Sequence, residues 1–140
     1  MTLPRAFHST PIAHRGLHDV NAGLPENSRA SIRAAIAAGY GIEIDLQLSA
    51  DHAAMVFHDY ALDRLSMASG ALRLRKVEEL AQIQLKGGDE GIPPLREILD
   101  LVAGQVPLLI ELKDQDGGMG QDIGPLEAAA AEGLAGYVGP

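Results

Sequence analysis

The sequence predicts an α/β fold with a parallel sheet, formed by one domain. Two observations support this prediction. Short apolar runs, each of a length suited to one buried strand, alternate along the chain with segments of helical periodicity. The chain has 140 residues, 46% of them hydrophobic, which is enough for the core of one domain and too few for two.

The first third of the chain predicts a strand, a helix and a second strand. The first apolar run lies within residues 12–16. Turn and helix-start signals follow at residues 24–28, and a helical segment over residues 30–36 ends before Gly39. Residues 42–48 alternate strictly between apolar and polar side chains, which is typical of a strand that buries its apolar face against helices.

The middle of the chain departs from this alternation. After a turn-like break, residues 53–58 have the composition of a return strand, so we expect a hairpin that brings His58 back toward Asp45. Residues 61–91 carry weaker signals, with one short helix expected around residues 77–80. We interpret 61–91 as an irregular insertion.

The last third returns to the α/β pattern. A proline pair opens a helix whose apolar side chains recur at helical spacing over residues 95–102, and Gly104 is expected just beyond its end. The next strand is predicted over residues 106–113. A loop rich in Asp and Gly over residues 115–124 and an Ala-rich helix over 126–132 complete the order.

Composition excludes several kinds of site and partner. The formal charge of −8 is a poor electrostatic match for nucleic acid or an anionic membrane surface, so neither is expected as a partner. The absence of cysteine removes disulfides, thiolate catalysis and Cys-ligated zinc. The sequence has no apolar run long enough for a membrane span and no signal-peptide apolar region near Met1, so we expect a cytoplasmic location.

The charged residues at the ends of the apolar runs form the candidate site. The carboxyl ends of parallel strands meet at one edge of a sheet, where ligands collect. Three carboxylates, two imidazoles, a guanidinium and an ammonium group occur there, which is the set of groups that a metal-dependent phosphoester site uses. They belong to Glu43, Asp45, Glu111, His14, His58, Arg15 and Lys113.

Each of these residues also has a purely structural interpretation. Glu43 and Asp45 alone fit the solvated polar face of an edge strand. A single histidine beside apolar residues is more often structural than functional. Glu111 favours the metal site, because it follows an apolar run without helical spacing. Ion pairing with the carboxylates is the alternative role of Arg15 and Lys113.

The motifs together resemble those of the glycerophosphodiester phosphodiesterases. Six blocks occur in the family's order and spacing from about His14 to Lys113. They are Ile12-Ala13-His14-Arg15-Gly16, Pro25-Glu26-Asn27-Ser28, Glu43-Ile44-Asp45-Leu46-Gln47-Leu48-Ser49, Val56-Phe57-His58-Asp59 with Leu62-Asp63-Arg64, Ile92-Pro93-Pro94-Leu95, and Ile110-Glu111-Leu112-Lys113. One block alone is a weak signal, but six in register are hard to obtain by chance.

The resemblance implies a TIM-type barrel and hydrolysis of glycerophosphodiesters, small-molecule substrates, to glycerol 3-phosphate and an alcohol. It also implies a divalent metal, Ca²⁺ or Mg²⁺, with Glu43, Asp45 and Glu111 as ligands. Independent chemistry agrees, because carboxylate oxygens suit such hard cations. His14 and His58 match the family's general acid and base, and imidazole titrates near neutral pH.

The remaining matches concern the substrate. Arg15 and Lys113 match positions that contact the substrate phosphate, and Glu26 matches a position that supports the site. A carboxylate at a helix N-terminus is the alternative for Glu26. Which histidine acts first as base, and whether water or the neighbouring glycerol hydroxyl attacks, stays open. His8, His18 and His52 match no motif and are expected on the surface.

The chain departs from the family pattern in two ways. Residues 65–70 differ from the threonine-rich start that the family carries there, which leaves the choice of alcohol open. A TIM barrel also needs about 250 residues and eight strands, whereas three barrel strands are predicted here. We therefore expect residues 1–140 to be an N-terminal part of the catalytic domain, whose open sheet edge favours self-association.

Two other functions remain as alternatives. One is a related phospholipase D-like lyase acting on sphingomyelin or lysophospholipid, which shares the plan of two histidines and three carboxylates. The absence of cysteine and of a signal peptide counts against it. The other is a non-catalytic half-barrel that binds metal or a partner chain.

Overall fold

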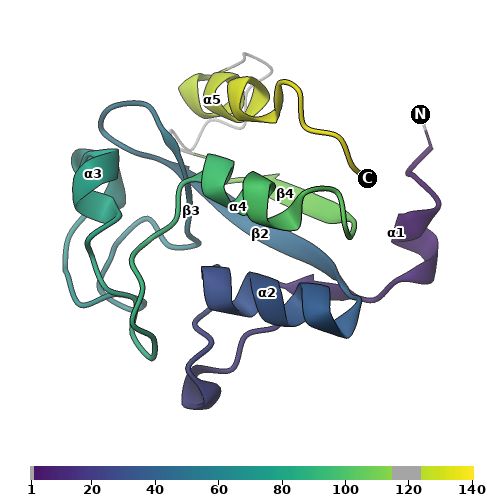
Figure 1. The fold of residues 1–140 in the computed structure, drawn as a ribbon. Helices are drawn as coiled ribbons and strands as arrows, with labels where there is room; N and C mark the ends of the chain where they lie inside the picture. The colour runs from purple at the N-terminus through teal and green to yellow at the C-terminus, as the bar shows by residue number, and fades with distance from the viewer. Residues whose placement is uncertain (1, 115–123) are drawn as a thin grey trace.

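The computed structural model describes residues 2–114 and 124–140. The loop predicted over residues 115–124 therefore lies, apart from its last residue, outside the described residues. The described elements form an open α/β sheet with its main helices on one face (Figure 1). Within this part of the chain, no helix combines the length and the apolarity that crossing a membrane requires.

The sheet is organised around its longest strand, β2 (Gly41–Leu48). β1 (Ile12–His14) pairs parallel with the first half of β2, and β3 (Ala54–Val56) pairs antiparallel with its second half. β4 (Leu108–Leu112) pairs parallel along the opposite side of β2. The described sheet thus has three parallel strands and one antiparallel return strand, as the sequence predicts.

Three helices cover one face of this sheet (Figure 1): α2 (Arg29–Ala38), α4 (Leu95–Val102) and α5 (Pro125–Leu134). Their apolar side chains form the main core together with the apolar side chains of β2. Since successive strand residues point to opposite faces, the polar side chains of β2 lie on the face away from the helices. That face holds the candidate site.

A second hydrophobic cluster lies under residues 61–91. This segment contains η2 (Leu72–Leu74) and α3 (Val77–Leu80), which occupies the predicted position. The buried members of the cluster are Met55, Phe57, Leu62, Leu72, Leu80, Leu85 and Ile92. Two other short elements, α1 (Ala6–Ser9) and η1 (Val20–Ala22), lie on either side of β1 in the sequence.

The N-terminus of α2 is fixed by contacts that reach across the chain. The carboxylate of Glu90, at the end of the insertion, accepts hydrogen bonds from the backbone N–H groups of Arg29 at 3.0 Å and Ala30 at 2.9 Å. Ser28 caps the same helix through its side chain. These contacts hold the turn before α2 in place, and two residues of that turn enter the candidate site.

We expected every apolar run to form a buried strand. This expectation is wrong for the two outer strands, β1 and β4. β2 is buried over nearly its whole length, but β1 and β4 are partly exposed because each has a free edge. Leu109 and Leu112 are 45% and 40% exposed. β4 is also shorter than the predicted strand 106–113, because Pro107 has no N–H group to donate to the sheet.

The segment after α5 begins to line the free edge of β4. The backbone N–H of Leu108 donates to the carbonyl of Pro140 at 3.0 Å. On the other side of the strand, the N–H of Lys113 donates to Leu46 at 3.1 Å. Because the direction of the N–H groups alternates along a strand, those of Ile110 and Leu112 point to the free edge as well.

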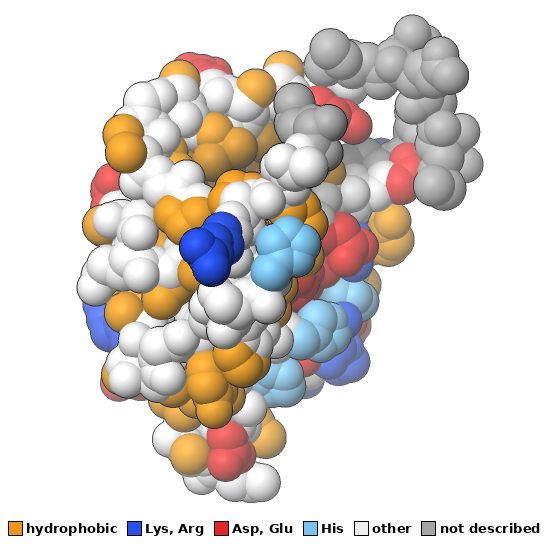
Figure 2. Space-filling view, turned by 90° about the vertical axis from the view of Figure 1, so that its right-hand side faces the viewer, with side chains coloured by type: hydrophobic (Ala, Val, Ile, Leu, Met, Phe, Trp, Pro, Cys, Tyr) orange, Lys and Arg blue, Asp and Glu red, His pale blue; other side chains and the backbone are white. Residues whose placement is uncertain are grey.

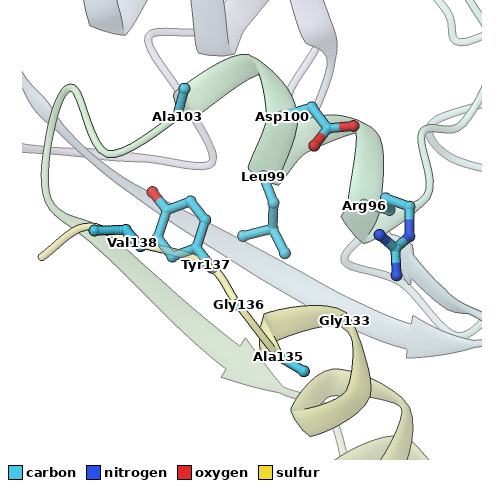
Figure 3. Close-up of a pocket in the computed structure, with 9 residues that line it drawn as sticks. All are labelled: Arg96, Leu99, Asp100, Ala103, Gly133, Ala135, Gly136, Tyr137 and Val138. Atoms are coloured by element: carbon cyan, nitrogen blue, oxygen red, sulfur yellow. The ribbon is translucent and has the colours of Figure 1, made fainter.

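A shallow hollow lies between α4 and the segment after α5 (Figure 3). Arg96 and Asp100 are its charged lining residues, and the rest of the lining is mostly small or apolar. The hydroxyl of Tyr137 accepts a hydrogen bond from the N–H of Gly104 at 3.1 Å, which ties the two walls together. Since α4 covers the apolar face of the sheet, this hollow is separate from the polar face of β2.

Candidate active site

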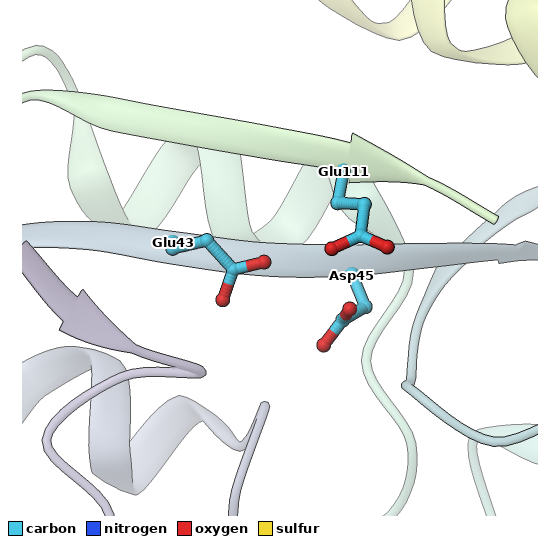
Figure 4. Close-up of side chains that lie close together, drawn as sticks. All are labelled: Glu43, Asp45 and Glu111. Atoms are coloured by element: carbon cyan, nitrogen blue, oxygen red, sulfur yellow. The ribbon is translucent and has the colours of Figure 1, made fainter.

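Three carboxylates from two adjacent strands form the centre of the site. Parallel pairing places Asp45 of β2 beside Glu111 of β4, and Glu43 lies two residues earlier on the same face of β2. One carboxylate oxygen from each residue lies within 4.8 Å of the others. Figure 4 shows the three side chains gathered on one side of the sheet.

This group of carboxylates fits a hard divalent cation. Ligand oxygens lie about 2.3–2.6 Å from Ca²⁺ and about 2.0–2.1 Å from Mg²⁺, so opposite ligands are at most about 5.2 Å and 4.2 Å apart. The three oxygens lie within 4.8 Å of one another, which is compatible with shared coordination of either cation. Within the described residues, Glu43 Oε1 is buried and has no hydrogen-bond partner. A buried oxygen without a donor is suited to a cation.

Burial and charge set the protonation of the two buried carboxylates in opposite directions. Burial raises the pKa of Asp45, but hydrogen bonds from Lys113 and Asn27 outweigh it and hold this pKa below the ordinary value. Burial raises the pKa of Glu43 against a hydrogen bond from the Arg15 backbone, and the charge of Asp45 raises it further. Glu43 is therefore the carboxylate whose charge is least compensated.

Arg15 contacts the site with both its backbone and its side chain. It has a left-handed backbone conformation, with φ at 59°, and its N–H donates to Glu43 Oε2 at 3.0 Å. Its Nη1 donates to Glu26 Oε1 at 2.9 Å, and its Nε lies 3.4 Å from Asp45 Oδ2. Gly16 continues the turn with φ at 78°, and a Cβ atom there would lie 2.5 Å from a side-chain oxygen of α2, so the turn requires glycine.

Lys113 completes the positive charge around the carboxylates. Its Nζ lies 2.9 Å from Asp45 Oδ1 and 2.6 Å from Glu111 Oε1. Burial lowers the pKa of Lys113, but the hydrogen bonds to Glu111 and Asp45 outweigh it and raise this pKa. The ion pairs considered as the structural role of Arg15 and Lys113 are thus present. The same ion pairs hold the positively charged groups of Arg15 and Lys113 beside the carboxylates.

The two predicted histidines are carried by different elements of the sheet region. His14 ends β1, and its Nε2 lies 4.0 Å from Glu43 Oε2 with 67% of the side chain exposed. His58 follows β3, which returns toward β2 as predicted, because the N–H of Phe57 donates to the carbonyl of Asp45 at 2.9 Å. Figure 2 shows histidine side chains beside acidic ones toward one edge of the viewed face.

The remaining predicted residues are placed as follows. Glu26 pairs with the guanidinium groups of Arg15 and Arg64, which differs from the helix-terminal role considered for it. Burial raises the pKa of Glu26, but the hydrogen bonds from Arg64 and Arg15 outweigh it and lower this pKa. His8, His18 and His52 are exposed, as predicted.

Three residues join the site that the sequence analysis did not assign to it. Asn27 Nδ2 donates to Asp45 Oδ2 at 2.9 Å, and Asp59 lies 2.7 Å from the ring of His58. Arg64 pairs with Asp59 and Glu26. Each lies within a sequence block already noted. Asn27 carried the clearest signal, because asparagine tolerates the left-handed backbone that this turn uses.

Comparisons with known proteins identify the family to which this chain belongs. The family model described as "Glycerophosphoryl diester phosphodiesterase family" matches residues 14–122. The glycerophosphodiester phosphodiesterase of Caldanaerobacter subterraneus subsp. tengcongensis is 33% identical over 113 residues, which cover 76% of this chain and 45% of that protein. The human glycerophosphodiester phosphodiesterase 1 is 38% identical over 96 residues, which cover 61% and 28%.

A solved structure extends the comparison to the fold. An Oleispira antarctica phosphodiesterase in complex with the product sn-glycerol-3-phosphate superimposes with a TM-score of 0.79 at 30% identity, covering 96% of this chain and 56% of that one. The chain thus spans between 28% and 56% of the length of these three relatives, and its open sheet corresponds to part of a TIM-type barrel. By its sequence motifs, its fold and the matched family model, the chain belongs to the glycerophosphoryl diester phosphodiesterase family.

Proposed function

We propose that this chain provides the metal-binding and phosphate-binding part of a site that hydrolyses glycerophosphodiesters to glycerol 3-phosphate and an alcohol. The observation that carries the proposal is the convergence of Glu43, Asp45 and Glu111 within 4.8 Å, with Arg15 and Lys113 beside them. Membership of the family and the product bound to the Oleispira antarctica relative support the choice of substrate.

The cationic residues are proposed to hold the substrate phosphate. Arg15 offers a planar fork of N–H donors and Lys113 a compact positive charge, and both already lie at the carboxylates. During cleavage of the ester bond, negative charge develops on the phosphoryl oxygens. Arg15 and Lys113 would stabilise that charge from the positions that they already occupy.

The histidines are proposed to move protons. Cleavage of the diester needs one group to remove a proton from the attacking hydroxyl and another to protonate the leaving oxygen. His14 and His58 lie on different elements around the same carboxylates, so one can act on each partner of the reaction. Glu26 would orient Arg15 through the hydrogen bond between them.

A divalent cation, Ca²⁺ or Mg²⁺, is proposed to bind Glu43, Asp45 and Glu111. When bound, such a cation supplies charge that polarises phosphoryl oxygens and lowers the pKa of an attacking hydroxyl. The uncompensated oxygen of Glu43 supports this assignment. We also propose that the protein acts in the cytoplasm.

The test is a product assay on the natural protein that contains these residues. Glycerophosphocholine and lysophosphatidylcholine are supplied in parallel, with and without a chelator, and both glycerol 3-phosphate and released choline are quantified. We expect glycerol 3-phosphate from glycerophosphocholine, lost on chelation and restored by Ca²⁺ or Mg²⁺. Turnover of lysophosphatidylcholine alone would contradict the proposal and favour the lyase.

We also infer that the 140-residue chain self-associates through the free edge of β4. Leu109 and Leu112 are exposed there, and the N–H groups of Ile110 and Leu112 point outward. An exposed strand edge with apolar side chains is a template for pairing with another strand. Half of a barrel pocket also lacks walls, so we expect the isolated chain to have negligible diesterase activity.

A further inference from the structure

The exposed residue Arg64 connects two parts of the site that the proposed mechanism treats separately. Its Nε and Nη2 donate to the two carboxylate oxygens of Asp59, each at 2.7 Å. Its Nη1 and Nη2 donate to the two oxygens of Glu26 at 3.1 and 3.2 Å. One guanidinium therefore forms a two-point pair with each of two carboxylates.

Each of these carboxylates holds a different candidate functional residue. Asp59 Oδ1 lies 2.7 Å from Nδ1 of His58. Glu26 Oε1 accepts a hydrogen bond at 2.9 Å from Arg15, whose Nε reaches toward the metal-binding carboxylates. The chain of contacts runs from His58 through Asp59, Arg64 and Glu26 to Arg15.

We propose that Arg64 is a positioning residue, which fixes the tautomer and orientation of His58 through Asp59 and holds the Arg15 guanidinium through Glu26. The proposal deepens the proposed function and rests on it for the roles of His58 and Arg15. Arg64 is not expected to touch the substrate itself.

The tautomer of His58 depends on which atoms of Asp59 and of the ring carry a proton near neutral pH. A carboxylate with the ordinary Asp pKa of ~3.9 is already ionised near neutral pH, and the hydrogen bonds from Arg64 lower the pKa of Asp59 further, to about 2, so Asp59 has no proton to donate to His58. Nδ1 of the neutral ring must then carry the hydrogen, which leaves the lone pair on Nε2 to accept a proton. Without Arg64, Asp59 loses both contacts that hold it against His58.

The simpler interpretation is a surface ion pair, because half of the Arg64 side chain is exposed. Isolated exposed pairs contribute little, and many contribute nothing measurable. Two features distinguish Arg64 from that case. Both of its pairs are bidentate, and its partners Asp59 and Glu26 are only 24% and 12% exposed and each bind a second site residue.

The test is a spectroscopic measurement of the His58 tautomer in the 140-residue chain. Long-range ¹H–¹⁵N spectra of histidine-labelled protein are recorded about 1.5 pH units above the ordinary imidazole pKa of ~6.5, with His58→Gln used for assignment. We expect an Nδ1–H tautomer in the wild type. Arg64→Gln should shift His58 toward the Nε2–H form that free histidine prefers.

Two further variants make the result specific. Arg64→Lys keeps the charge but offers only a point donor, so an intermediate tautomer ratio is expected. Arg75→Gln is the matched control. Arg75 forms an exposed ion pair with Glu79 of α3, and this pair lies outside the site. It should leave the His58 signal unchanged. An unchanged tautomer in both Arg64 variants, or loss of the fold in both, would overturn the proposal.

A kinetic measurement separates this proposal from the proposed function. In the natural protein, Arg64→Gln should lower kcat for glycerophosphocholine by about 10–100-fold, as is usual when a residue that orients a functional group is removed. Arg64→Lys should restore part of it. If the natural protein hydrolyses no glycerophosphodiester, the proposed function fails, whereas the tautomer measurement still decides the role of Arg64.

Discussion

Asn27 and Asp45 hold each other through two hydrogen bonds, although 18 residues separate them in the sequence. Asn27 Nδ2 donates to Asp45 Oδ2 at 2.9 Å, and the backbone N–H of Asp45 donates to Asn27 Oδ1 at 3.3 Å. Both residues are only 1% exposed. The turn before α2 thereby orients the most buried carboxylate of the candidate metal site.

Removal of the Asn27 side chain should weaken metal binding without removing a ligand. Residues that orient a ligand typically contribute 10–100-fold in metal affinity, and we expect a loss of about that size in Asn27→Gly, measured by calorimetry with Ca²⁺. Asn27 has φ at 56°, so Asn27→Ala should show the same loss of affinity plus additional backbone strain. Affinity equal to the wild type in Asn27→Gly would contradict the orienting role.

Divalent metal should stabilise the chain through Glu43. The clustered carboxylates repel one another, and a cation relieves that repulsion. At a Ca²⁺ concentration 100 times the dissociation constant, the expected stabilisation is about 2.7 kcal/mol, visible as a rise in the melting temperature. Glu43→Ala should abolish the rise. Glu132→Ala, at an exposed carboxylate on α5, is the control and should retain it. Equal shifts in both variants would refute the assignment.

The two histidines should affect turnover rather than metal binding. In the natural protein, His14→Ala and His58→Ala are each expected to lower kcat by ~10²–10⁴-fold, because proton transfer is lost while the ligands remain. Metal affinity, measured in parallel, should change little. If a variant lost metal binding but kept its residual turnover, that histidine would be a ligand and not an acid or base.

Asp59 should make stability depend on acid pH in a defined window. Its pKa is about 2 in the folded protein, below the ordinary value of ~3.9 in an unfolded chain. The ionised group therefore stabilises the fold above about pH 4, and this contribution disappears as the pH falls through about 2. Asp59→Asn should be less stable than the wild type by about 1–2 kcal/mol near neutral pH, which is less than the full pKa shift corresponds to because solvent screens this partly exposed pair, with the gap closing toward pH ~2.

Denaturant unfolding at a series of pH values measures this gap. Asp100→Asn, at an exposed carboxylate on α4, is the matched control and should run parallel to the wild type across the window. A constant gap between Asp59→Asn and the wild type at all pH values would show that the lost stability comes from something other than the charge of Asp59.

A charge on the free edge of β4 should prevent self-association. Leu112→Lys places a lysine on the exposed strand edge, where such residues block pairing with another chain. Met67 is 70% exposed but lies in the insertion, so Met67→Lys is the matched control. Sedimentation of the 140-residue chain should show oligomers for the wild type and Met67→Lys and a smaller species for Leu112→Lys. A monomeric wild type would contradict the inference.

The order of elements was predictable because each leaves a local signature. Strict alternation over residues 42–48 defined the central strand β2, and proline followed by helical spacing defined α4. The gathering of Glu43, Asp45 and Glu111 was also predictable. The expected reason was wrong in part, because Glu43 and Asp45 lie within β2 and not at its carboxyl end. They meet Glu111 because alternate residues of adjacent parallel strands lie on the same face of the sheet.

The sequence could not reveal how much of each strand is buried. The apolar runs of β2 and β4 are similar, yet Asp45 is 1% exposed and the side chain of Glu111 is 54% exposed. The difference arises because β2 has neighbours on both sides, whereas β4 has a free edge. The number of neighbours that a strand has is set by the assembled sheet. The apolar run of one strand does not indicate it.

The family, the order of elements and the set of chemical groups at the site could therefore all be inferred from the sequence. Which side chains orient the candidate site residues became known only from the folded chain. Asn27 orients Asp45, and Arg64 bridges Asp59 to Glu26, across separations that no local pattern spans. Side-chain hydrogen bonds act only at about 3 Å, so such partners become defined once the turn before α2, the return strand and the insertion have packed around β2.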